Sequence, residues 1–171
     1  MFKKAGSLCL IICVILSLHA CAYATYTDSM SDYLVSDAAL SFPELILFPQ
    51  KETIAEDDII MYQSEEISTI IDDDVYFILC CRYSTDVYAD EIARFKESNA
   101  VFDETLFAFP AYVMLFTGDN YEYVLLDELN NTVIYVAAQT AGWEMFEKLP
   151  EQYLPLTKPD IDICRYQYDF R

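Results

Sequence analysis

Residues 75–83 form an apolar run that directly follows three aspartates and is rich in β-branched and aromatic side chains. Successive side chains of a strand point to opposite faces, so a run that is apolar on both faces predicts a sheet-interior strand covered on both sides. Residues 56–63 predict the preceding strand, and residues 65–74 connect the two. We therefore expect an antiparallel hairpin with a long connection.

A helical pattern follows this run directly. Residues 84–86, Ser-Thr-Asp, are of the types that cap helix N-termini. Apolar side chains then recur at i, i+4 and i+7, at Tyr88, Ile92 and Phe95. This spacing predicts a helix over residues 86–98 whose apolar stripe lies on one face of the sheet, with Asp90 and Arg94 paired on its solvent side.

Three more apolar runs, separated by turn-forming residues, predict a meander of strands. These runs are residues 112–117, 121–127 and 132–139, with turns at 118–120 and 128–131. Two strands, a helix and three strands give the order ββαβββ. This order predicts a single α+β domain over residues 42–171, with a largely antiparallel sheet of about five strands and one main helix.

Residues 1–24 carry the parts of a secretory signal peptide: two lysines, an apolar segment of 11 residues and a processing site. The apolar segment is too short to span a bilayer, which needs about 20 residues. Residues 22–24, Ala-Tyr-Ala, fit cleavage after Ala24 and free secretion. Residues 18–21, Leu-His-Ala-Cys, instead resemble a bacterial lipobox, in which Cys21 is lipid-modified and becomes the mature N-terminus.

Both interpretations place the mature protein outside the cytoplasm, either lipid-anchored in the cell membrane or secreted. Residues 25–41 are mostly small and polar, and they predict a tether or a short helix before the domain. Both interpretations also remove His19, the only histidine of the chain. The mature protein then has no Ser-His-Asp or Cys-His catalytic centre and no His-ligated metal site.

The chain is strongly acidic, with a net charge of −19 that becomes −21 when the two lysines of the leader are removed. Such a surface repels phosphate backbones, so we expect no nucleic-acid partner, and it favours basic partners or cations. Neither the GxGxxG nor the GxxxxGK[ST] phosphate-binding motif is present, and we expect no cofactor.

Clustered carboxylates suggest two chemistries, and neither pattern is complete. Asp57 and Asp58 could approach residues 72–74 across the hairpin and bind Ca²⁺, but the EF-hand spacing is absent. We therefore favour a solvated acidic connector and expect no metal site. Glu122 and Asp127 are the best candidates for the acid–base pair of a glycan hydrolase. Their odd offset places them on opposite faces of a regular strand, and we assign no catalytic residue.

Cys80 and Cys81 are neighbours on the predicted interior strand, so they point to opposite faces and cannot share one site. We expect both to be buried as small apolar side chains. In the alternative, one of them forms a disulfide with Cys164, provided that the C-terminal tail adds a strand nearby.

Four tyrosines lie on the predicted meander: Tyr112, Tyr121, Tyr123 and Tyr135. Exposed tyrosines would form a surface for a glycan or a protein. Tyrosines packed between the sheet and the helix would instead be part of the core, and we favour this second interpretation.

The order of these features resembles small exported lipoproteins of unassigned function from Gram-positive gut bacteria. The shared features are a leader ending at a cysteine, an apolar run framed by Phe-Pro pairs at 42–43 and 48–49, an acidic strand–helix core and a Tyr-rich meander. The resemblance implies no activity. We predict a non-enzymatic domain, held to the membrane by a lipid, that binds a basic protein or a glycan. The alternatives are a carboxylate-dependent hydrolase acting on glycans and an acidic antagonist of a basic secreted protein.

Overall fold

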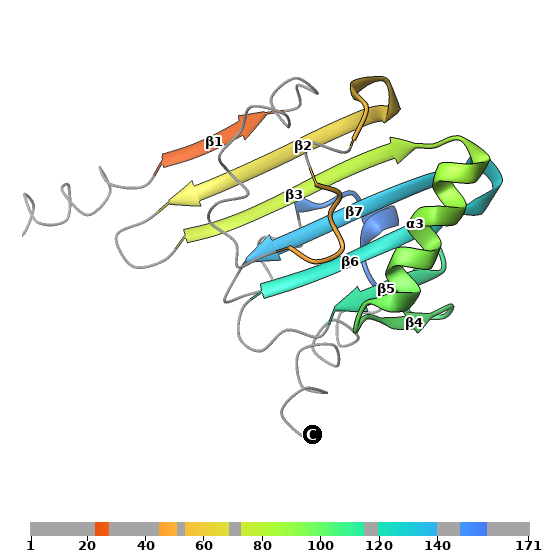
Figure 1. Ribbon diagram of the computed structural model, residues 1–171. Helices are drawn as coiled ribbons and strands as arrows, with labels where there is room; N and C mark the ends of the chain where they lie inside the picture. Colours follow the sequence, from red (N-terminus) through yellow and green to blue (C-terminus); the bar gives the residue numbers. More distant parts are fainter. Residues whose placement is uncertain are drawn as a thin grey trace, which may run out of the picture.

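The computed structural model shows one antiparallel sheet with a helix across one of its faces (Figure 1). It describes residues 23–27, 45–50, 54–68, 73–114, 120–139 and 148–156. Seven strands follow one another in the sheet in the order β1-β2-β3-β7-β6-β5-β4. Among these described residues, no helix has the length and apolar character needed to cross a membrane.

The strands and helices have the following bounds. The strands are β1 (Tyr23–Thr27), β2 (Ile59–Ser68), β3 (Asp73–Arg82), β4 (Val101–Asp103), β5 (Ala111–Met114), β6 (Asn120–Asp127) and β7 (Thr132–Gln139). The helix that packs on the sheet is α3 (Thr85–Glu97), and the 3₁₀ turns are η2 (Glu56–Asp58), η3 (Glu128–Asn130) and η5 (Glu151–Tyr153).

The predicted α+β class with one main helix is confirmed, and the order ββαβββ is that of β2, β3, α3, β5, β6 and β7. Two strands were not predicted. β4 has only three residues, too few for a periodic signal. β1 begins inside the predicted leader and occupies the first residues of the predicted tether. The rest of that tether, including a short helix over residues 30–40, lies outside the described residues.

The hairpin of β2 and β3 forms as predicted, but its connection is short. β2 continues to Ser68, which pairs with Asp73 at the start of β3. The predicted connector of residues 65–74 is therefore wrong, because most of it belongs to the two strands. Acidic residues occupy this end of β2, so the pattern of apolar positions does not predict a strand there.

One face of the sheet carries a core beneath α3 and beneath the irregular segment of residues 45–50, called segment 45–50 below. Both lie on the near face in Figure 1. Phe95 is fully buried and contacts the rings of Tyr112 and Tyr135 at centroid distances of 5.6 and 6.1 Å. Segment 45–50 adds Leu47 and Phe48 to this core.

The opposite face carries a second core, beneath residues 104–110 and 148–156. The ring of Phe107 stacks on that of Tyr123 at 4.7 Å, and the Tyr123 hydroxyl donates a hydrogen bond to the carbonyl of Tyr153. Lys148 forms an ion pair with Glu65 of β2, which links residues 148–156 to the sheet. The interior strands are thus covered on both faces, as the pattern of residues 75–83 predicted.

The helix and the β6–β7 turn also follow the sequence signals. Ser84 caps α3 by accepting a hydrogen bond from the N–H of Val87. The turn between β6 and β7 ends at Asn131, whose φ of 48° is left-handed, a conformation that asparagine tolerates better than most residues. This turn fixes the register of β6 on β7, and hence the position of Glu122.

Candidate functional site

The buried carboxylate of Glu122 binds three backbone N–H groups of segment 45–50. The N–H groups of Leu47 and Phe48 donate to its Oε1 at 2.6 and 3.2 Å, and the N–H of Ile46 donates to its Oε2 at 3.1 Å. Consecutive N–H groups of a strand point in opposite directions, so three of them can meet one carboxylate only where the chain curls. The segment is therefore not a strand, although its apolar run would suit one.

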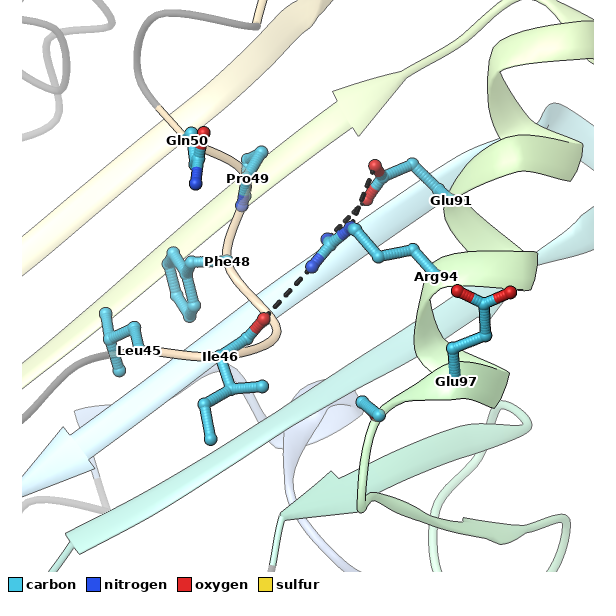
Figure 2. Close-up of a pocket in the computed structure, with 9 residues that line it drawn as sticks. Leu45, Ile46, Phe48, Pro49, Gln50, Glu91, Arg94 and Glu97 are labelled. Atoms are coloured by element: carbon cyan, nitrogen blue, oxygen red, sulfur yellow. Dashed lines mark hydrogen bonds and ion pairs between the residues drawn. The ribbon is translucent and has the colours of Figure 1, made fainter.

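Arg94 of α3 satisfies the carbonyls of the same residues. Its Nη1 donates to the carbonyl of Ile46 at 3.0 Å (Figure 2). Its Nη2 donates to the carbonyl of Leu47 at 2.7 Å. Arg94 pairs with Glu91 at 2.6 Å rather than with Asp90, so the predicted Asp90–Arg94 pair is wrong. The guanidinium thus satisfies two carbonyls of the segment, and one of them belongs to Leu47, whose side chain is fully buried.

A chain of hydrogen bonds runs from Arg94 into the core. Tyr135, which is fully buried, donates to Oε2 of Glu91 at 2.8 Å, and its oxygen lies 2.9 Å from the hydroxyl of Tyr83. Because Tyr135 gives its only proton to Glu91, Tyr83 must be the donor to Tyr135. Burial raises the pKa of Tyr135 well above 10, and it also raises the pKa of Tyr83. Both hydroxyls therefore stay protonated, and the hydrogen bond from Tyr135 holds Glu91 in place.

Segment 45–50 and α3 enclose a half-open groove of about 580 Å³, within the usual size range of ligand pockets. Its apolar lining comes from the segment: Leu45, Ile46, Phe48 and Pro49. Its charged lining comes from α3: Glu91, Arg94 and Glu97. In Figure 2 the carboxylates of Glu91 and Glu97 lie on two sides of Arg94.

The groove has an acidic rim rather than an anion-binding centre. Burial lowers the pKa of Arg94, but the hydrogen bond and charge of Glu91 outweigh burial and leave that pKa raised, so the guanidinium is always charged. Its N–H groups donate four hydrogen bonds, two to Glu91 and two to carbonyls, out of the five that a guanidinium can donate. Glu97 is exposed at the end of α3 and adds a negative charge to the rim. The arrangement suits a cationic group beside an apolar one.

Burial raises the pKa of Glu122, and three backbone N–H donors and the charge of Arg94 offset only part of that rise. The protonated carboxyl is therefore favoured in the folded state relative to the unfolded chain. The resulting stability is fully present below the ordinary pKa of 4.5 and is lost as the pH rises through the raised value.

The raised pKa of Glu122 predicts how its contribution to stability changes with pH, and the variant Glu122→Gln, which cannot titrate, is the reference. The free energy of unfolding of the wild type, minus that of the variant, should decrease as the pH rises from 4 to 8. Denaturant unfolding of both proteins across this range measures it, and the subtraction removes the titration of all other carboxylates. A difference that grows with pH would mean that the N–H donors outweigh burial.

Glu122 and Asp127, the candidate acid–base pair that the odd offset argued against, do not come together. Glu122 shares its face of β6 with Val124 and Leu126, under segment 45–50, while Asp127 ends the strand and accepts a hydrogen bond from Asn130. Their offset of five positions along the strand places the two residues about 17 Å apart. Glu122 is thus the anchor of a segment rather than half of a catalytic pair.

The two aspartate clusters lie at opposite ends of the hairpin. Asp58 precedes Ile59, which pairs with Cys81 near the end of β3, whereas Asp73 and Asp74 begin β3. The expectation that the clusters could approach each other is therefore wrong, because an antiparallel register places them about 25 Å apart. The described residues contain no group of three or more metal-binding side chains.

Cys80 and Cys81 are both buried and lie on opposite faces of β3, as predicted. Burial raises their pKa values to about 11 and about 12, so both remain thiols at neutral pH. Cys80 contacts the hydroxyl of Tyr153 at 3.9 Å, which places it on the face covered by residues 148–156. Cys164 lies outside the described residues, and so does Cys21.

The four tyrosines of the meander are buried, as the favoured interpretation predicted: Tyr112, Tyr121, Tyr123 and Tyr135. None of them belongs to an exposed binding face. The residues that form the groove were not recognised as a site. The sequence does contain a signal for these residues. An aromatic–proline segment precedes a helix that carries Glu91, Arg94 and Glu97 on successive turns, and these two elements form the two walls of the groove.

Neither protein-family models nor curated protein sequences nor solved structures give a match to this chain. The function of the chain is therefore inferred from the geometry of its site.

Proposed function

We propose that the chain is an exported, lipid-anchored and non-enzymatic domain that binds a basic partner at the cell surface. The observation that carries this proposal is the groove between segment 45–50 and α3, which joins an apolar lining to an acidic rim. It lies on a body whose net charge is −21 without the leader, and such a charge steers cationic partners toward it. A basic protein is favoured over a glycan because the candidate tyrosines are buried.

The pairing of β1 supports processing at Cys21 over cleavage after Ala24. β1 pairs with β2 from Tyr23↔Ser68 to Thr27↔Ser64. Cleavage after Ala24 would remove two of these five pairs, whereas a mature chain that starts at Cys21 retains all of them. A lipid on Cys21 would then lie only two residues, about 7 Å of chain, from the edge of the sheet.

Replacing Cys21 by serine is expected to move the protein from the membrane fraction to the medium or to leave it as an unprocessed precursor. Globomycin, which blocks lipoprotein signal cleavage, should cause the precursor to accumulate. The matched control is Cys9→Ser, in the apolar part of the leader, which should leave processing unchanged. Normal processing and membrane retention of the Cys21 variant would contradict the anchor.

The binding itself is tested by capture on the full exported protein. A panel of basic and acidic proteins of similar size is passed over it at low and at high salt. Basic proteins should be retained at low salt and released as the salt rises, because the attraction is electrostatic and screened. Equal retention of acidic and basic proteins would contradict the proposed partner class.

A further inference from the structure

We infer that the groove between segment 45–50 and α3 binds an extended peptide segment of the basic partner, one in which a lysine or arginine stands beside an apolar side chain. This inference rests on the proposed function and names the part of the partner that is recognised. The groove joins an apolar wall from segment 45–50 to a charged wall from α3. It belongs to a strongly acidic protein, which attracts basic segments.

Part of the apolar lining of the groove is exposed to solvent. Ile46 is 45% exposed, although its neighbour Leu47 is fully buried in the core. Both backbone polar groups of Ile46 are satisfied by Glu122 and Arg94, so the residue is held in a fixed conformation with its side chain outward. A fixed apolar side chain at the mouth of a groove loses little entropy when a ligand covers it.

The charged half of the groove is negative where it is accessible. Arg94 pairs with Glu91 and gives four of its five N–H groups to Glu91 and to carbonyls of segment 45–50, so it offers little to an incoming anion. Glu91 is in turn held by Arg94 and Tyr135. Glu97 is exposed on the same rim and remains the carboxylate best placed to receive a cation. A cationic side chain therefore fits beside Glu97, with its apolar neighbour against Ile46.

The groove favours a peptide over a folded surface. A volume of about 580 Å³ is that of a small-ligand pocket, which accepts a few side chains but not a broad interface. A flexible basic segment would bring its lysines to the acidic body by long-range attraction and then place one apolar side chain in the groove.

The test uses a synthetic peptide of alternating lysine and leucine, with two companion peptides in which serine replaces leucine or glutamate replaces lysine. Binding to the full exported protein is measured by calorimetry. The lysine–leucine peptide should bind best, and the glutamate–leucine peptide should not bind. The variant Glu97→Lys should weaken binding of the lysine–leucine peptide by about tenfold, through lost attraction and new repulsion.

Glu104→Lys is the matched control, because it makes the same change of charge at an exposed position in the segment that covers the opposite face. It should weaken binding much less. The variant Ile46→Ser should weaken the lysine–leucine peptide by about fivefold and leave the lysine–serine peptide unchanged. Unfolding curves of all three variants confirm that each is folded under the binding conditions.

Equal effects of the Glu97 and Glu104 variants would overturn the inference, because binding would then be a property of the whole acidic surface. The proposed function would survive that result. Equal binding of the lysine–leucine and lysine–serine peptides would also overturn the inference, since the apolar lining would play no part. If neither peptide binds while basic proteins are still captured, the recognised feature is not an extended segment in this groove.

Discussion

The variant Glu122→Ala is expected to lose about 3–5 kcal/mol of unfolding free energy, because it leaves three N–H donors of segment 45–50 with no partner beside a buried space. Glu122 is only 1% exposed, and it is the shared acceptor for Ile46, Leu47 and Phe48. Water cannot replace it without opening the core beneath the segment. Denaturant unfolding followed by tyrosine fluorescence measures the loss.

The matched variant is Glu122→Gln, which keeps the shape and one acceptor oxygen. It should cost about 1–2 kcal/mol, since it presents an amide donor to one of the three N–H groups. The alanine variant should also lose the groove and bind the lysine–leucine peptide less well. An alanine variant as stable as the glutamine variant would show that the N–H groups have other acceptors.

Replacing Phe95 by alanine is expected to lower the unfolding free energy by a similar amount, about 3–5 kcal/mol. Phe95 is the fully buried residue of α3, and its ring packs on those of Tyr112 and Tyr135. Removing it leaves a cavity that rigid aromatic neighbours fill poorly. Because α3 carries Arg94 and Glu97, the variant should also destabilise the charged wall of the groove.

Val87→Ala is the control on the same helix. Val87 is 42% exposed, and its truncation should change the stability by less than about 0.5 kcal/mol. Thermal and denaturant unfolding of both variants test the pair. A small effect at Phe95 together with a large one at Val87 would mean that α3 packs on the sheet by a different face.

Local signals predicted the elements whose structure depends on neighbours in the sequence. The periodicity of Tyr88, Ile92 and Phe95 and the cap at Ser84 fixed α3 to within one residue at each end. β7 has the predicted bounds because apolar positions and turn residues both mark it. The acidic end of β2 was missed because edge-proximal strands can be polar, and sheet pairing rather than apolar pattern defines them.

The groove depends on contacts that the sequence does not reveal. Glu122 and Leu47 are 75 positions apart, and nothing near either residue indicates the other. The sequence singles out Glu122 only as one member of a candidate acid–base pair, to which we assign no catalytic role, and it gives no sign of the segment that Glu122 holds. A glutamate that alternates with core-facing positions of an interior strand must find donors, and those donors need not belong to a ligand. Here they are the backbone of segment 45–50.

Glu122 holds segment 45–50 on the sheet and so builds one wall of the groove. Amide hydrogen exchange at Ile46, Leu47 and Phe48 tests this role of Glu122 most directly. We predict that in the wild type these three amides are protected to a degree approaching that of β7. In Glu122→Ala they should exchange orders of magnitude faster, while the amides of β3 and β7 remain protected. Rapid exchange of the three amides in the wild type, at the rate of an exposed loop, would contradict the claim.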